Sequence, residues 1–415
     1  MTSSLETLLS HLELRTSKLI DLNLERVLQL KDRLSINPRF KIITVAGTNG
    51  KGSICFYLNE FLLKKNNLNV GLYTSPHFFK FNERIKINGN DVTDQELVDA
   101  INLILKNDKD QHLTYFEITT LAAIIIFEKY KIDIAILEVG LGGRLDAVNA
   151  FDSNISIISS IGMDHTEYLG NTINKIAYEK SGVMRPEKIC IIGEEINNLA
   201  LIEAADKVKA KAFIYNKDFS YKSITKIFNK KTSNHHNILN KDEISKKNLS
   251  CAVFALQELG FNYEYEDFID VANKIFFGRF NVIAEYPEVI IDVAHNEDSL
   301  KNLVIKINKL PKKRTRFIFS ILKDKNFKDL VSIFNTLDND FDWFIAPLNT
   351  DRAEGVNTIN SALTKSGHKA IYQFNSINEA YKQAYKASGK DDRIIVFGSF
   401  YVISEVFKGQ DYVNK

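Results

Sequence analysis

The sequence predicts an α/β fold built from two units, each with a mostly parallel sheet, and three observations support this. Short apolar runs typical of buried strands alternate with amphipathic helical stretches from about residue 40 onward. The alternation starts again near residue 289 and continues almost to the end of the chain. A chain of 415 residues is also too long for one ordinary core, so two domains are expected.

The first unit shows a run of strand candidates separated by helical patterns. The candidates are Ile42–Val45, Val70–Thr74, Ile132–Glu138, Ile155–Ile161, Ile189–Gly193 and Phe213–Tyr215. Helical patterns cover Asp94–Leu105 and Phe116–Tyr130. Residues Phe219–Ser245 are polar and weakly periodic, so we expect irregular structure or a small excursion from the sheet there. A helix over Lys247–Leu259 follows. We therefore expect a P-loop-type, mostly parallel sheet covered by helices.

The second unit is smaller and Rossmann-like. Its five strand candidates are Val289–Ala294, Arg316–Ile321, Trp343–Ala346, Ala370–Phe374 and Ile394–Phe397. A glycine interrupts an apolar run at Gly278–Phe280, so we place the boundary there. The expected domains are residues 1–278 and residues 279–415.

Composition narrows the class of protein. The formal net charge of +2 argues against a dedicated nucleic-acid binder. The longest apolar stretch, Leu121–Phe127, is too short to span a bilayer, and Met1–Leu9 lacks the pattern of an export signal. The three cysteines are widely spaced and form no metal or disulfide pattern. We therefore expect a cytoplasmic protein without a membrane or nucleic-acid partner.

The most informative segment is Thr44–Ser53, which reads TVAGTNGKGS. It follows an apolar strand candidate and precedes a helical pattern, so its glycines turn backbone N–H groups toward one point at a helix N-terminus. Lys51 can contact phosphate oxygens, and Ser53 can contact phosphate or Mg²⁺. The spacing departs from the common phosphate-loop pattern, because Val45 occupies the position at which that pattern has its first glycine. A plain glycine-rich turn is the alternative, but we predict ATP binding.

Polar residues follow several strands of the first unit, where open α/β sheets bind their ligands. Ser75 follows one strand, Glu138 ends another, and Asp164 and His165 follow a third. Each of these alone could be a turn or ion-pair residue. Together, downstream of a phosphate loop, they predict a Mg²⁺ site, in which a histidine would be an unusual ligand.

Two further clusters are ambiguous from the residues alone. Lys180, in the segment Glu179–Gly182, has the ordinary interpretation of a solvated or ion-paired lysine. The segment Asp292–Asn296 ends the first strand of the second unit, where its carboxylate and imidazole could contact a ligand. An N-cap for the next helix explains Asn296 equally well.

These motifs resemble the folylpolyglutamate synthase/dihydrofolate synthase enzymes of the Mur ligase superfamily over nearly the full length. The matching segments are Ser17–Val27, the phosphate loop, Thr74–His77, Tyr115–Glu117, Leu137–Asn149, Asp164–Thr166, Glu179–Gly182, Gly278–Phe280, Asp292–Asn296 and Gly398–Phe400. The number and order of these motifs make the resemblance specific. One departure is Asn23, which replaces a glycine usual in the first segment.

The resemblance implies roles for individual residues. The ATP contacts would be Asn49, Gly50, Lys51, Gly52, Ser53, Asn248, Arg279 and Asp292. The ligands of two Mg²⁺ ions would be Ser75, Glu138, His165 and Lys180, the lysine as a carbamate. This overturns the ordinary interpretation of Lys180. Lys51, Lys180 and His165 would be the catalytic residues.

The resemblance also implies two substrate pockets. The pterin or folate contacts would be Asp21, Leu22, Asn23, Leu24, Thr114, Tyr115, Phe116, Glu117, Leu145, Asp146 and Ala147. His295 and Ser399 would be linked to glutamate binding.

The expected activity is that of an ADP-forming ligase that adds L-glutamate to dihydropteroate and to reduced folates through an acyl phosphate, in folate biosynthesis and one-carbon metabolism. A synthase that only extends folates is the alternative within the family. A P-loop small-molecule kinase, a nucleotide switch and a cell-wall ligase are alternatives outside it. We expect a monomer whose partners are its small-molecule substrates.

Overall fold

The computed structural model describes residues 4–15, 21–109, 113–194, 199–229, 242–325, 327–328, 330–338 and 340–409. The chain divides into two compact units, the first made of Met1–Gly162 and Thr166–Lys274, the second of Met163–His165 and Ile275–Lys415. Each unit contains one mostly parallel sheet with helices on both faces, which confirms the predicted fold class. Within the described ranges, no helix is long and apolar enough to cross a membrane.

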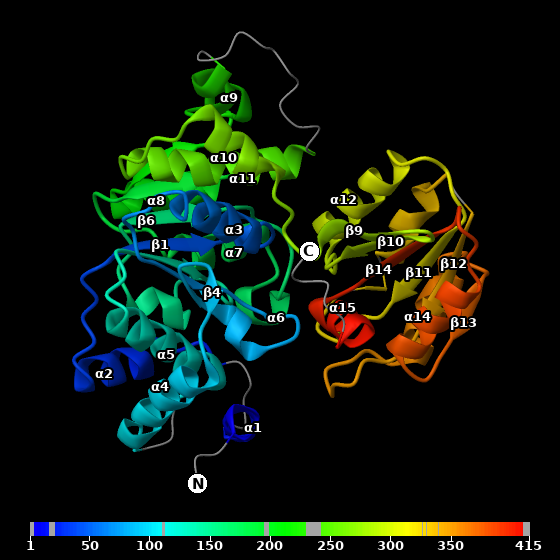
Figure 1. The fold of residues 1–415 in the computed structure, drawn as a ribbon, viewed down its shortest axis with the longest axis horizontal. Helices are drawn as coiled ribbons and strands as arrows, with labels where there is room; N and C mark the ends of the chain where they lie inside the picture. The colour runs from blue at the N-terminus through cyan, green and yellow to red at the C-terminus, as the bar shows by residue number, and fades with distance from the viewer. Residues whose placement is uncertain are drawn as a thin grey trace. The chain divides into compact units, whose positions relative to one another are not determined.

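The first unit is built on an eight-stranded sheet in the order β4-β3-β2-β5-β1-β6-β7-β8 (Figure 1). The strands are β1 Lys41–Ala46, β2 Val70–Tyr73, β3 Ile85–Ile87, β4 Asn90–Asp91, β5 Ile134–Glu138, β6 Ile155–Ile158, β7 Ile189–Ile192 and β8 Lys211–Ile214. All six expected strands are present, with ends shifted by a few residues. The sequence did not predict β3 and β4, which add antiparallel strands at one edge.

Helices cover both faces of this sheet. They are α1 Leu5–Leu14, α2 Glu25–Arg33, α3 Lys51–Leu62, α4 Asp94–Asn107, α5 Tyr115–Lys129, α6 Thr166–Leu169, α7 Ile173–Ser181, α8 Leu199–Val208, α9 Tyr221–Asn229, α10 Glu243–Glu258 and α11 Tyr265–Asn273, with short 3₁₀ turns η1 Phe81–Arg84 and η2 Ala147–Ala150. Helices α3, α10 and α11 pack on one face, and α2, α4 and α5 on the other (Figure 1). Along β1, Ile43 and Val45 pack in the core under α3, α10 and α11. Ile42 and Ala46 pack in the core under α2, α4 and α5, because successive side chains of a strand point to opposite faces.

One segment of this unit is more regular than the irregular structure expected for it. Residues Tyr221–Asn229, within the segment expected to be irregular, form helix α9. Tyr221, Ile224 and Phe228 lie on one side of it and pack into the core with α10 and α11. An apolar stripe of three residues is enough to stabilise a short helix that has a core to pack against. Residues 230–241 of the same segment, and residues 17–20 of the matched N-terminal segment, lie outside the described residues.

The second unit is built on a six-stranded sheet in the order β13-β12-β11-β14-β10-β9. Its strands are β9 Arg279–Glu285, β10 Glu288–Asp292, β11 Thr315–Phe319, β12 Phe341–Ile345, β13 Ile371–Gln373 and β14 Arg393–Phe397. Its helices are α12 Glu297–Asn308, α13 Val356–Lys365, α14 Ile377–Lys386 and α15 Phe400–Phe407, with the 3₁₀ segment η3 Val331–Thr336. All five expected strands are present. Strand β9, which pairs antiparallel with β10, was not predicted.

Candidate active site

The phosphate-loop candidate connects β1 to α3 and requires glycine at two positions. Gly47 has a φ of 142°, and a Cβ there would lie 1.9 Å from Ser159 Oγ. Gly50 has a φ of 92° at the N-cap of α3, and a Cβ there would lie 2.7 Å from Asn248 Oδ1. Both positions combine a left-handed backbone with a close neighbour, so a larger residue fits neither. The backbone itself is therefore what shapes this loop.

Two serines that the sequence analysis did not single out hold the loop against the end of β6. Ser159 Oγ donates to Asn49 O at 2.7 Å, and Ser160 Oγ accepts from Asn49 N at 2.9 Å. Thr48 N donates to Ser160 O at 2.8 Å. Backbone groups of Thr48 and Asn49 are therefore tied to the segment that follows β6. Both serines fell inside the predicted strand Ile155–Ile161, but β6 ends at Ile158 and leaves them in the loop that follows.

Two lysine side chains converge on one carbonyl of this loop. Lys51 Nζ donates to Gly47 O at 2.9 Å, and the buried Lys180 Nζ donates to the same oxygen at 3.0 Å. The first turn of α3 carries no acidic residue, so the positive end of the helix dipole is not neutralised there. Asn248 is also buried, and its Oδ1, beside Gly50, has no hydrogen-bond partner among the residues that the structure describes. The site is suited to an anionic ligand with further hydrogen-bonding groups.

Two of the predicted metal ligands lie at neighbouring strand ends. Glu138 ends β5, Ser75 follows the adjacent β2, and Ser75 N donates to Glu138 Oε2 at 3.1 Å. A hydroxyl and a carboxylate offer the oxygen ligands that Mg²⁺ prefers. In the described part of the chain, no three His, Cys, Asp or Glu side chains cluster as a metal site. The donors here therefore fit an ion that is also held by water, phosphate and other oxygen groups.

Helix α7 carries Lys180 and is locked to the loop that follows β5. A Cβ on Gly143 would lie 2.9 Å from Glu179 O, and a Cβ on Gly182 would lie 2.3 Å from Arg144 Cβ. Arg144 also forms an ion pair with Glu179 at 2.9 Å. These contacts fix the end of α7 and hence the direction of Lys180.

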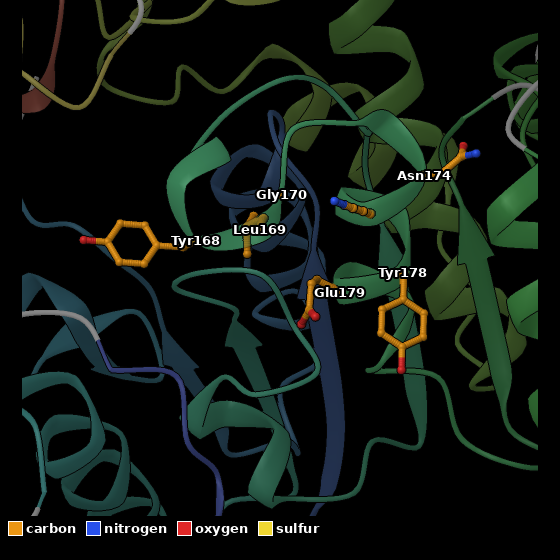
Figure 2. Close-up of a pocket in the computed structure, with 7 residues that line it drawn as sticks. Tyr168, Leu169, Gly170, Asn174, Tyr178 and Glu179 are labelled. Carbon is orange, nitrogen blue, oxygen red and sulfur yellow. The ribbon is translucent and has the colours of Figure 1, made fainter.

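Figure 2 shows a pocket on α6 and α7 of the first unit. Its lining residues are Tyr168, Leu169, Gly170, Asn174, Lys175, Tyr178 and Glu179. Lys180 does not line it, because its ammonium reaches Gly47 O instead. Glu179 therefore lines this pocket, whereas its neighbour Lys180 contacts the phosphate loop.

Asp146 is buried and organises the same loop. Its carboxylate accepts from Leu141 N at 2.8 Å and from Val148 N at 3.0 Å, and it caps η2. Burial raises the pKa of Asp146 to about 6, although these backbone donors and Lys51 act in the opposite direction. Its neighbours Leu145 and Ala147 are half-buried and buried. Asp146 thus has a structural role independent of any ligand.

The two other segments predicted for the pterin pocket are joined by two ion pairs of one arginine. Thr114 and Glu117 form a capping box at the start of α5. Arg26, on α2, bonds both Glu117 and Asp21. Asn23 Oδ1 accepts from Glu25 N at 2.9 Å, so the residue that replaces a family glycine stabilises the start of α2.

The remaining predicted pocket residues are apolar or aromatic. Leu22, Leu24, Tyr115 and Phe116 are half-buried. A Cβ on Gly140 would lie 2.5 Å from Phe116 Cζ, so the Phe116 ring packs against the loop that follows β5.

In the second unit, Arg279 and Asp292 face each other across β9 and β10. Asp292 is buried, and Ala294 N donates to its Oδ1 at 2.8 Å. Burial raises the pKa of Asp292, whereas the charges of Lys306 and Arg279 lower it. The Arg279 guanidinium lies 5.7 Å from the ring centre of Phe400, next to Ser399. Ser399 is buried and caps α15, with its Oγ accepting from Val402 N at 3.3 Å.

A charged cluster forms around Asp164 in the second unit. Lys325 Nζ donates to Asp164 Oδ1 at 2.6 Å, and Asn296 Nδ2 donates to Oδ2 at 3.1 Å. His295 Nε2 lies 3.7 Å from Asp164 Oδ2, and Lys325 Nζ lies 3.2 Å from His165 Nε2. Burial alone would raise the pKa of Asp164, but the side chains of His295 and Lys325 hold it well below its usual value. The predicted residues His165 and His295 are thus brought together.

Lys325 was not predicted from the sequence, because no recognisable motif surrounds it. Its side chain is only 7% exposed, which is unusual for lysine and is the feature that marks it in the structure. Of the four predicted metal ligands, Ser75, Glu138 and Lys180 belong to the first unit and His165 to the second. That the four form one site stays a prediction.

Family models match most of the chain. The model of the Mur ligase middle domain matches residues 45–257, and that of the Mur ligase glutamate ligase domain matches residues 278–400.

Similar proteins include relatives named as folate enzymes. The chain is 36% identical to a dihydrofolate synthase/folylpolyglutamate synthase of Buchnera aphidicola from Schizaphis graminum, over 91% of this chain and 90% of the relative. Its fold matches E. coli FolC in complex with DHPP and ADP with a TM-score of 0.86, at 31% identity and 97% coverage of both chains. It also matches a bifunctional folylpolyglutamate synthase/dihydrofolate synthase with Mn, AMPPNP and L-glutamate bound, with a TM-score of 0.85, at 32% identity and 98% coverage of both chains.

Proposed function

Because this chain belongs to the dihydrofolate synthase/folylpolyglutamate synthase family of Mur ligases, we propose that it is an ATP-dependent, ADP-forming amide ligase. It joins L-glutamate to dihydropteroate, giving dihydrofolate, and to reduced folates, giving polyglutamates. The observation that carries this proposal is the glycine-shaped loop on which Lys51 and Lys180 converge, in the same unit as the Ser75–Glu138 pair. The ligands named for the similar structures, ADP, AMPPNP and L-glutamate, support it.

The proposed reaction has two steps. A carboxylate oxygen of the acceptor attacks the γ-phosphorus of ATP, the bond to ADP breaks, and an acyl phosphate forms. The amine nitrogen of glutamate then attacks the acyl carbon, phosphate leaves, and the nitrogen loses a proton. Lys51 and the N–H groups at the start of α3 bind and neutralise the phosphates during the first step. Mg²⁺, held by Ser75, Glu138, His165 and Lys180, would supply further charge neutralisation.

We further propose that Lys180 acts as a carbamate. Its neutral amine adds to CO₂, the N–C bond forms, and a proton is released, so a cation becomes an anionic oxygen ligand. Two observations support this: Lys180 is buried, and its Nζ donates to the same carbonyl as Lys51 Nζ. Two ammonium groups that share one acceptor repel each other, and a carbamate beside Lys51 would replace this repulsion by attraction.

The carbamate predicts a specific rescue. Lys180→Ala should lose ADP formation by at least about hundredfold, because an anionic ligand is removed, and acetate or another small carboxylate should restore part of it. Lys175→Ala, on the exposed side of the same helix, is the matched control and should keep its activity. Full activity of Lys180→Ala without added carboxylate would remove Lys180 from the mechanism.

The two units would divide the remaining tasks. Residues 1–278 would bind the ATP phosphates and the pterin-bearing acceptor. Residues 279–415 would contribute nucleotide contacts from Arg279 and Asp292 and glutamate contacts from His295 and Ser399. Burial of Asp292 and Ser399 at strand ends, next to Arg279 and α15, supports this assignment.

We also propose that the protein works in the cytoplasm as a monomer, without nucleic-acid or membrane partners. All three cysteines are free and buried, which fits a reducing compartment. Light scattering coupled to size-exclusion chromatography tests the oligomeric state, and a mass well above 47.3 kDa would contradict it.

The decisive experiment measures ADP release by the purified protein with Mg²⁺-ATP and L-glutamate. Dihydropteroate and a reduced folate monoglutamate are added in parallel reactions, with glutamate omitted as a control. Turnover with both acceptors, dependent on glutamate, is the expected result. Turnover with the folate alone would leave a chain-extending synthase. Glutamate-independent phosphorylation would indicate a kinase.

A further inference from the structure

Arg26 links two parts of the first unit that the pterin pocket is predicted to use. It lies on α2, and its guanidinium reaches both the segment before this helix and the first turn of α5. Nη1 donates to Asp21 Oδ2 at 2.5 Å, and Nη2 donates to Asp21 O at 3.0 Å. Nη2 also donates to Glu117 Oε1 at 2.9 Å, and Nε donates to the same atom at 3.3 Å. One side chain therefore makes four contacts with two predicted pocket residues.

The other oxygen of Glu117 is also engaged. Glu117 Oε2 accepts from Thr114 N at 2.6 Å, which closes the capping box of α5. The Glu117 side chain is 5% exposed, whereas that of Asp21 is 40% exposed. Both oxygens of Glu117 are thus bound within the protein, and little of its surface is accessible to a ligand. Asp21, by contrast, is accessible and is fixed by Arg26 on one side.

Because it is buried and bonded through both oxygens, the Glu117 carboxylate is a fixed point to which Arg26 is attached; we call it the anchor of Arg26. Glu117 is rigid because α5 and the core fix it, and the planar guanidinium transfers that rigidity to Asp21. Loss of the guanidinium would remove the ion pair and the hydrogen bonds that hold Asp21 in the described part of the chain. The Asp21–Leu24 segment would then have to be ordered by the ligand, and this ordering costs binding free energy.

We propose that Arg26 is a positioning residue for the acceptor site, and that Glu117 is its anchor rather than a contact of the acceptor. Together they hold the Asp21–Leu24 segment in the conformation that receives the pterin-bearing acid. This inference rests on the proposed function, because it takes the pterin-bearing acid as the ligand of this segment. It predicts an effect on acceptor binding that is separate from phosphate binding at Lys51.

The test compares Arg26→Gln with the wild-type protein in steady-state assays of ADP release. KM for dihydropteroate and KM for the reduced folate should both rise by about tenfold or more, because a charge-assisted link is lost. The KM values for ATP and for L-glutamate, and kcat, should stay within about twofold. A variant that is merely less stable would contain less active protein and show a lower apparent kcat at an unchanged acceptor KM.

A matched control removes a comparable ion pair elsewhere in the same unit. Arg15 pairs with Asp108 at 2.7 Å, with side chains 11% and 9% exposed. Arg15→Gln loses this pair, and the partner that the structure describes for Arg15, Asp108, is not a predicted pocket residue, so its acceptor KM should not change.

Two further variants make the result decisive. Glu117→Gln should raise the acceptor KM by a similar factor, and the double variant Arg26→Gln/Glu117→Gln should be no worse than either single variant, because both break the same link. Arg26→Lys keeps the charge but cannot reach both partners in the same geometry, so its KM should lie in between. If Arg26→Gln does not fold, Arg26→Lys alone decides the question.

The outcomes separate this inference from the function on which it rests. A wild-type protein that releases no ADP with either acceptor contradicts the proposed function and this inference together. An active wild type with unchanged acceptor KM in Arg26→Gln, or in Arg26→Lys where only that variant folds, contradicts this inference alone. Equal rises in the KM for ATP and for the acceptors would also contradict it.

Discussion

The phosphate loop of the first unit takes its shape from the backbone, whereas the cluster around Asp164 in the second unit is made of side chains from distant parts of the chain. The loop needs glycine at positions 47 and 50, where a Cβ would collide with Ser159 and Asn248. The cluster brings together Asp164, His295 and Lys325, which are separated by more than a hundred residues at the widest.

This difference predicts how each region fails. A site shaped by the backbone is sensitive to the volume of the side chains in its loop. One added methyl group at a closely packed glycine displaces the N–H groups of that loop. A cluster of side chains is sensitive to charge, because removal of one partner leaves the others buried and uncompensated. Substitutions that change only volume or only charge therefore test the comparison directly.

The largest effect is expected from Gly47→Ala. The added Cβ would lie 1.9 Å from Ser159 Oγ, at a φ of 142° that other residues rarely adopt, so the loop must shift. Displacement of a catalytic loop by about 1 Å can cost on the order of a hundredfold in rate. We therefore expect kcat/KM for ATP, measured by ADP release, to fall by at least about hundredfold.

Gly260→Ala is the matched control for this prediction. Gly260 also has a positive φ, 87°, but a Cβ there would meet no atom within 4 Å. It should lower the free energy of unfolding by about 1 kcal/mol through backbone strain and leave ADP release unchanged. Equal losses of activity in the two variants would show that strain, and not the close approach to Ser159, shapes the loop.

A smaller effect, on stability, is expected from Lys325→Met in the second unit. The substitution keeps the length of the side chain but leaves the Asp164 carboxylate, 10% exposed, without its cation. Breaking a buried ion pair on one side costs about 3 kcal/mol. Urea unfolding should detect this loss.

The comparison pair for this variant is on the surface of the same unit. Lys301 and Glu297 are about half exposed, so Lys301→Met should cost less than about 0.5 kcal/mol. Similar losses in both variants would mean that the Asp164 cluster is not held by charge.

The smallest effect depends on pH and involves Asp146. Burial raises its pKa from 3.8 to about 6 in the folded protein. Its contribution to stability is therefore fully present below about pH 4 and is lost as the pH rises through about 6. A shift of about two pKa units corresponds to about 2–3 kcal/mol at most.

The measurement is the free energy of unfolding of the wild-type protein and of Asp146→Asn, by urea, at several values between about pH 4 and pH 7. The wild type should lose about 2 kcal/mol relative to the variant across this interval, because Asn does not titrate. A constant difference between the two proteins would show that Asp146 is ionised throughout, held by its backbone donors.

The sequence could predict what is local along the chain. The phosphate loop, its strand and its helix are consecutive, and the strands of both sheets are short apolar runs. Ser75 and Glu138 could be paired because parallel strands end at the same edge of a sheet.

Interactions between distant residues were not predictable in this way. Neither Lys325 nor Arg26 stands in a pattern that reveals its partner, since ion pairs depend on which segments meet in the fold. Helix α9 was missed because its apolar residues are few among polar ones, and only the core shows that they suffice. Strand β9 was missed because only one of its seven residues is buried and it begins at the expected boundary.

The contact between the loop after β5 and the end of α7 constrains how this sequence can change. Gly143 lies against the carbonyls of Glu179 and Lys180, and Gly182 lies against Arg144, so each segment leaves no space for a side chain on the other. A single substitution at either glycine meets backbone or Cβ atoms that cannot rotate away. Because almost every residue type carries these atoms, a change of side chain in the partner segment cannot make room, and sequence variation in both segments is confined to the positions beside these two glycines.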